Sequence, residues 1–124
     1  MILLLMVFLH IVDDFYLQRI LASMKQKSWW IKQEGYKELY KHDYVMALFM
    51  HAFSWTFMVM LPIAYCMNWE ISVFFGFVFV WNTVVHMVID HLKANKGLIN
   101  LVQDQTIHLG QICATFALFV GGWM

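Results

Sequence analysis

Residues 69–90 have the sequence WEISVFFGFVFVWNTVVHMVID, and this stretch decides the fold class. A helix drawn through it is apolar around its whole circumference, which is typical of a helix surrounded by lipid. Its length matches the roughly 20 residues that cross a hydrocarbon core of about 30 Å. His86 and Asp90 lie four residues apart near its end, so they project from one face of the helix. We therefore expect a membrane-spanning helix that carries an ionisable pair.

The whole chain has the same apolar composition. Its 124 residues are 62% hydrophobic and 13% charged, whereas soluble domains average about 45–50% and about 25%. One proline and six glycines leave no room for long linkers, so we predict a single domain over residues 1–124. The formal net charge of zero gives no indication of a nucleic-acid partner. Cys66 and Cys113 lie in apolar segments and are interpreted as small core residues.

Hydropathy and turn residues divide the chain into four apolar segments. We predict an all-α fold, a polytopic membrane four-helix bundle with four transmembrane helices in antiparallel, up-down order. The predicted spans are about 1–22, 44–66, 70–94 and 98–123. The first segment lacks a basic leader and contains Asp13 and Asp14, so it is not interpreted as a cleaved signal peptide.

Basic residues indicate the orientation in the membrane. All Lys and Arg lie in or beside the connection 23–43 or the connection 95–97: Arg19, Lys25, Lys27, Lys32, Lys37, Lys41, Lys93 and Lys96. The positive-inside rule then places both connections in the cytoplasm and both termini outside it, in a bacterial inner membrane. The connection 23–43 also contains four aromatic residues, which suits a segment lying along anionic lipid headgroups. A solvated basic loop is the alternative interpretation of that connection.

Three His/Asp pairs and one further histidine lie within the apolar segments. Each pair is spaced by four residues, so its two side chains point the same way. Ionisable groups in a bilayer cost several kcal/mol and usually face a partner, a cavity or an ion. Counted at ~1.5 Å per residue, most of these groups lie about 10–14 Å from the cytoplasmic helix ends. The candidate metal ligands are His10, Asp14, His51, His86, Asp90, Asp104 and His108.

Imidazole and carboxylate groups together are ligands of divalent transition metals, with zinc expected first and manganese or iron as alternatives. Helix bundles assemble such sites from pairs on facing helices. Seven donors exceed the ligands of one tetrahedral ion, so we expect one or two ions per chain, or some carboxylates that orient histidines. Gln18, Asn82 and Gln105 are the predicted orienting residues around the ligands. A metal-free polar network or proton path is the alternative.

The motifs resemble those of a known family. They are H10-x-x-x-D14-F15-x-x-Q18, H51-A52, H86-x-x-x-D90-x-x-K93 and D104-Q105-x-x-H108. In this order they are similar to the small bacterial and phage membrane proteins catalogued as domain of unknown function 3307. The resemblance covers nearly the whole chain, and it implies that these residues form the family's site without implying a reaction.

Two classes of function remain open from the sequence. In the first, the protein is a metal-dependent membrane hydrolase acting on a lipid or lipid-linked phosphate, with Asp14 or Asp90 as general base and Lys93 holding the anionic headgroup. In the second, it is a non-enzymatic pore, ion or proton carrier, or phage-type membrane effector that uses the same His/Asp layer. Four short spans bury little surface, so we expect a homo-oligomer in either class. The enzyme is the reading that we favour, because a metal beside headgroups suits lipid chemistry.

Overall fold

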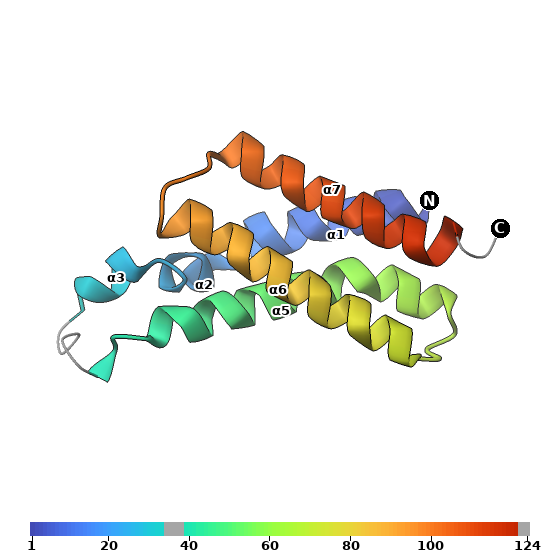
Figure 1. Cartoon of the computed structure of the whole chain (residues 1–124), viewed down its shortest axis with the longest axis horizontal. Helices are drawn as coiled ribbons and strands as arrows, with labels where there is room; N and C mark the ends of the chain where they lie inside the picture. The colour runs from blue at the N-terminus through green and yellow to red at the C-terminus, as the bar shows by residue number, and fades with distance from the viewer. Residues whose placement is uncertain (34–38, 122–124) are drawn as a thin grey trace.

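A computed structural model describes residues 1–33 and 39–121, and the described elements are all helical. The elements are α1 (Ile2–Val12), the π-helical turn η1 (Asp13–Leu17), α2 (Arg19–Met24), α3 (Lys27–Ile31), α5 (Asp43–Cys66), α6 (Val73–Ala94) and α7 (Leu101–Val120). The helices α1, α5, α6 and α7 run alternately up and down along the long axis of the molecule (Figure 1). Each packs against its neighbours, and α7 returns to α1, so the four form a closed bundle.

Local sequence signals explain where the helices begin and end. Asn100 and Gln103 form a reciprocal capping box at the start of α7, which satisfies two backbone N–H groups. Ser72 caps α6 by accepting from the N–H of Phe75 at 3.1 Å. Gly97 adopts φ +62° just after α6, a conformation that glycine enters without a Cβ penalty.

The bundle has an apolar half and a polar half. The apolar core fills the half that contains both termini and the α5–α6 turn, and its buried members come from all four long helices: Met6, Trp55, Val59, Met60, Ile63, Ala64, Phe75, Val78, Ile112 and Phe119. The buried histidines and aspartates lie toward the other ends of the same four helices and in the adjoining turn η1. Each long helix therefore contributes apolar residues at one end and ionisable residues at the other.

The predicted spans agree with the structure to different degrees. The span 44–66 corresponds to α5, whereas α6 and α7 begin about three residues later than predicted, at their capping residues. The predicted helix 1–22 is interrupted, because α1 passes into the π turn and the helix ends at Gln18, before α2 begins. Part of the connection 23–43 forms the short helix α3, and residues 34–38 of it lie outside the described residues.

Two helices, α5 and α6, are long and apolar enough to cross a membrane. In the most apolar 18-residue stretch of each helix, the buried share is 44% for α5 and 33% for α6. A core helix of a soluble protein would instead be mostly covered by its neighbours. The described residues thus form an all-helical fold, and two of their helices are long and apolar enough to cross a membrane.

Candidate metal centre

The structure brings the seven predicted ligands together. His10 comes from α1, Asp14 from η1 and His51 from α5, while α6 supplies His86 and Asp90 and α7 supplies the remaining pair. We call this set the His/Asp cluster: His10, Asp14, His51, His86, Asp90, Asp104 and His108. Asp14 retains 10% exposure of its side chain, and the other six are buried. Residues from four helices thus meet in one layer, as the common depth predicted.

Asp90 is the centre of the His/Asp cluster. Its Oδ2 lies 2.7 Å from Nε2 of His51 and 3.7 Å from Nε2 of His86. Its Oδ1 lies 3.3 Å from Nε2 of His108. The two oxygens of one buried carboxylate therefore face different histidines.

Two further carboxylate oxygens lie beside histidines without bonding to them. Oδ1 of Asp14 is 3.4 Å from Nε2 of His51, and Oδ1 of Asp104 is 3.1 Å from Nε2 of His108. Among the described residues, neither oxygen has a hydrogen-bond partner. Buried carboxylate oxygens are costly when unpaired, and protonation of the neighbouring imidazole would pair each of them. A cation between each carboxylate and its histidine would satisfy both.

Aromatic packing orients two of the imidazole rings. Trp55 stacks on His86 with ring centroids 4.2 Å apart, and His86 stacks on His108 at 4.1 Å. Within the described part of the chain, Nδ1 of His51, His86 and His108 meets no hydrogen-bond partner, whereas all three Nε2 atoms point into the cluster. Convergent Nε2 atoms are the arrangement that a bound divalent ion requires.

His10 differs from the other three histidines because both of its nitrogens are engaged. Nε1 of Trp55 donates to Nδ1 of His10 at 2.7 Å, so Nε2 of His10 carries the proton and donates to Oε1 of Gln105 at 3.0 Å. The amide of Gln105 in turn donates to Oδ2 of Asp104 at 3.1 Å and to Oδ2 of Asp14 at 3.4 Å. His10 therefore holds the side chain of Gln105 in place, and Gln105 in turn holds the carboxylates of Asp14 and Asp104.

The π turn positions two consecutive aspartates for different tasks. The N–H of Gln18 donates to the carbonyl of Asp13 at 3.1 Å, which is the five-residue spacing of a π turn. Asp13 is buried and accepts from Ser54 at 2.8 Å and from the Gln18 side chain at 2.7 Å. Both carboxylate oxygens of Asp13 thus accept hydrogen bonds, and the bond from Ser54 joins η1 to α5. Asp14 instead faces the His/Asp cluster.

Two lysines reach the cluster from its open end. Nζ of Lys25 lies 2.6 Å from Oδ2 of Asp90 and 3.2 Å from Nε2 of His51, and Nζ of Lys93 lies 3.0 Å from Oδ2 of Asp104. A cavity of about 290 Å³ opens beside them, lined by Asp14, Phe15, Ala22, Lys25, Gln26, Asp90, Lys93, Ala94, Asp104 and Gln105. The cluster is therefore accessible from this side through a mouth that holds two ammonium groups.

Two predicted orienting residues lie elsewhere. Gln18 bonds Asp13 and not a cluster residue. Asn82 lies in a separate polar layer nearer the middle of the bundle, where it donates to Thr115 at 2.9 Å and accepts from Gln111 at 2.9 Å. Gln105 is the one of the three that contacts the His/Asp cluster.

Sequence reasoning missed Lys25 and Trp55. Trp55 follows His51 by four residues and shares its helix face, so helical spacing could have found it. Lys25 lies outside every predicted span, in the turn between α2 and α3, and only the tertiary fold brings it to Asp90.

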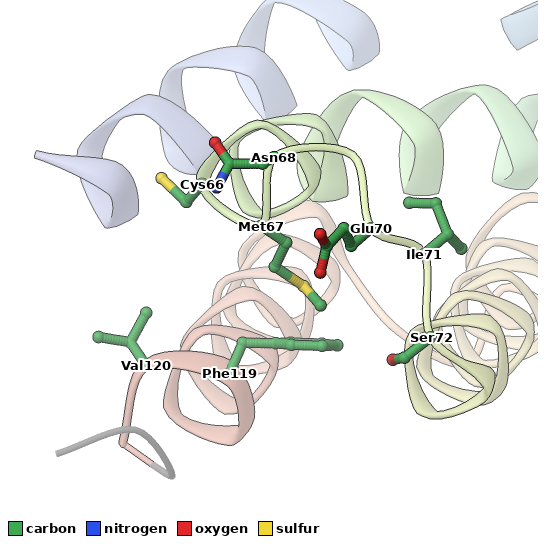
Figure 2. A pocket seen from close by; sticks show the side chains of 8 residues that line it. All are labelled: Cys66, Met67, Asn68, Glu70, Ile71, Ser72, Phe119 and Val120. Carbon is green, nitrogen blue, oxygen red and sulfur yellow. The ribbon is translucent and has the colours of Figure 1, made fainter.

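A larger hollow at the opposite end of the bundle has a different chemistry. It measures about 690 Å³ and lies between the α5–α6 turn and the end of α7 (Figure 2). Among the described residues that line it, Glu70 brings the single carboxylate and none is a histidine. The reactive side chains are thus concentrated at the other end.

A comparison of the sequence with protein families identifies a family. The family model described as "Protein of unknown function (DUF3307)" matches residues 2–122, which is the family that the motifs resemble. No curated protein and no solved structure matches the chain.

Proposed function

We propose, for a chain that belongs to the DUF3307 family of unknown function, that it is an integral membrane metal-binding protein and a metal-dependent hydrolase of a lipid or lipid-linked phosphate. The observation that carries this proposal is the His/Asp cluster itself, with three convergent Nε2 atoms and two unpartnered carboxylate oxygens at the base of a cavity that holds two lysines. A divalent ion there would polarise a phosphoryl oxygen and let its bound water ionise near neutral pH.

The membrane part of the proposal rests on exposed apolar surface. The outward face of α6 carries exposed large apolar side chains from its start as far as Val88: Val73, Phe74, Phe77, Val80, Trp81, Val84 and Val88. Surfaces of this kind are rare on soluble monomers and suit contact with lipid. We propose four crossings of a bacterial inner membrane, with α1 and α7 packed beside α5 and α6. The basic connection then faces the cytoplasm, and a homo-oligomer covers part of the lateral surface.

The location of the cavity supports an anionic lipid as substrate. Its mouth lies at the end of the bundle that carries the basic connection, so it would open at the cytoplasmic headgroup layer. Lys25 and Lys93 place positive charge at this mouth, where a phosphate would enter. Zinc is the first candidate for the ion, and manganese and iron are the alternatives.

The apolar half of the bundle favours an enzyme over a pore. From the His/Asp cluster, polar residues continue only as far as the layer of Asn82, Gln111 and Thr115 in the described chain. Beyond that layer, Val59, Ile63 and the other core residues fill the bundle. A conduction path needs an opening on both sides, whereas a site that processes headgroups needs one.

Metal content and lipid products test the proposal together. The protein purified without chelator should contain a divalent transition metal, and His86→Ala with His108→Ala should remove it and lower the thermal stability. His42→Ala is the matched control, because His42 is exposed and outside the cluster. Membranes containing the wild type should show a lipid product that is missing from membranes containing the double variant. Equal metal in both proteins would refute the site, and flux into liposomes without any lipid product would favour the pore or carrier.

A further inference from the structure

We infer that the His/Asp cluster holds two cations bridged by Asp90, and that the ammonium of Lys25 competes for one of the two positions. This inference rests on the proposed metal site and extends it. The structure divides the cluster around the two oxygens of Asp90, and each half contains a histidine and a second aspartate.

The first position is defined by Oδ2 of Asp90. Nε2 of His51 lies 2.7 Å from this oxygen. The same His51 nitrogen lies 3.4 Å from Oδ1 of Asp14 and 3.2 Å from Nε2 of His86. Asp14, His51 and His86 offer ligand atoms that all lie within 4.8 Å of one another. Neighbouring ligands of one ion bound at about 2.0–2.2 Å lie roughly 2.8–3.6 Å apart. The contacts of His51 with Asp14 at 3.4 Å and with His86 at 3.2 Å have this spacing, and the contact with Asp90 at 2.7 Å is slightly shorter.

The second position is defined by Oδ1 of Asp90. Nε2 of His108 lies 3.3 Å from it and 3.1 Å from Oδ1 of Asp104. These separations also fall within roughly 2.8–3.6 Å. Asp104 is 1% exposed, and its Oδ1 has no hydrogen-bond partner among the described residues, although it points at His108. Oδ1 of Asp14, on the other side of Asp90, is likewise unpartnered among the described residues, although the first position has two histidines and the second has one.

Lys25 distinguishes the two halves. Its Nζ contacts Oδ2 of Asp90 and Nε2 of His51, which are two of the atoms that define the first position. An ammonium and a divalent ion cannot share those atoms, so the first ion must displace Lys25. Lys93 contacts Oδ2 of Asp104, the oxygen that faces away from the second position, and leaves that position open. The two positions should therefore bind their ions with unequal affinity, the first more weakly than the second.

This arrangement makes Asp90 a shared ligand. A carboxylate that bridges two ions cannot also act as a free base, so activation of water falls to the ions themselves. Asp14 and Asp104 then each belong to one position, and replacing either should affect one ion only.

A Co²⁺ titration tests the inference on the full-length chain in detergent, after removal of metal with a chelator. The wild type should take up two equivalents, and Asp14→Asn and Asp104→Asn should each take up one. His108→Gln serves as a second variant for the Asp104 half. Helical circular dichroism of each variant confirms that it is folded. One equivalent in the wild type, or loss of all binding in a folded single variant, would overturn the two-ion assignment while leaving the proposed function standing. No binding by the wild type would refute the proposed function as well.

The competition by Lys25 has its own readout. Removing the ammonium with Lys25→Met should tighten the weaker equivalent by about tenfold if Lys25 fills the position roughly nine-tenths of the time. The stronger equivalent should not change. Lys27→Met is the matched control, because Lys27 is exposed two residues away. Equal affinities for the wild type and Lys25→Met would show that Lys25 does not compete.

Discussion

At the scale of single residues, the four histidines of the cluster have two roles. His51, His86 and His108 face a shared centre, and His10 supports the residues around it. His10 has a defined partner at each nitrogen, whereas the rings of His86 and His108 are held by stacking. Trp55 is the link between the two kinds, since it donates to His10 and stacks on His86. A buried network of this kind is stable only when each member has its partner.

Trp55→Phe should therefore destabilise the protein while keeping an aromatic ring beside His86. The change leaves Nδ1 of His10 buried without a donor, which costs about 1–3 kcal/mol. Thermal unfolding in one detergent measures the loss, with Trp81→Phe as the control, because Trp81 is 68% exposed on α6. Equal midpoints for the two variants would mean that the bond to His10 contributes nothing.

The sequence predicts which residues form the His/Asp cluster, because helical spacing is local information. Four-residue pairs such as His86 and Asp90 must share a face of any helix that contains them. The contribution of Lys25 is not predictable in this way, since it depends on how the turn after α2 folds back against α6. Asn82 shows the opposite case. It lies on α6 like His86, as predicted, but it bonds Thr115 in the separate polar layer and not a cluster residue.

At the scale of elements, the turn between α2 and α3 is fastened to the end of α6. Nδ2 of Asn95 donates to the carbonyl of Lys25 at 3.0 Å, and the N–H of Lys27 donates to Oδ1 of Asn95 at 2.6 Å. One side chain thus holds both ends of the segment that presents Lys25 to Asp90. The predicted helix 1–22 is interrupted earlier, at η1 and Gln18, because a π turn and the end of a helix at Gln18 leave no hydropathy signal.

Asn95→Ala should loosen this turn without disturbing the bundle. The amide of Lys27 loses its acceptor, so its hydrogen exchange should accelerate, and Co²⁺ uptake should shift in the direction of Lys25→Met. Asn100→Ala is the control: it removes the cap of α7 at a cost of about 1 kcal/mol, and it should leave exchange at Lys27 unchanged. Unaltered exchange in Asn95→Ala would show that other contacts hold the turn.

At the scale of the whole molecule, polarity is divided along the bundle axis. Antiparallel helices place the end of one beside the start of the next, so each long helix must change from apolar to ionisable in the opposite chain direction to its neighbours. Hydropathy averaged over a span cannot show this division, but the depth of each His and Asp can. The division gives the protein one end that carries the His/Asp cluster and one end with an apolar core, and the proposed function requires that the end with the cluster face the cytoplasm.

Labelling from the two sides of the membrane tests that orientation. Cys66 and Cys113 are exposed, so their interpretation from the sequence as core residues was wrong. Both are first replaced by alanine. Lys32→Cys then places a thiol at the end with the cluster, and Glu70→Cys places one at the α5–α6 turn, where both positions are exposed. Because basic residues stay on the cytoplasmic side, a membrane-impermeant maleimide added to intact bacterial cells should label position 70 and not position 32, and inverted vesicles should give the reverse. Labelling of both positions from the same side would contradict the crossing of α5, and with it a site that opens at the cytoplasmic headgroups.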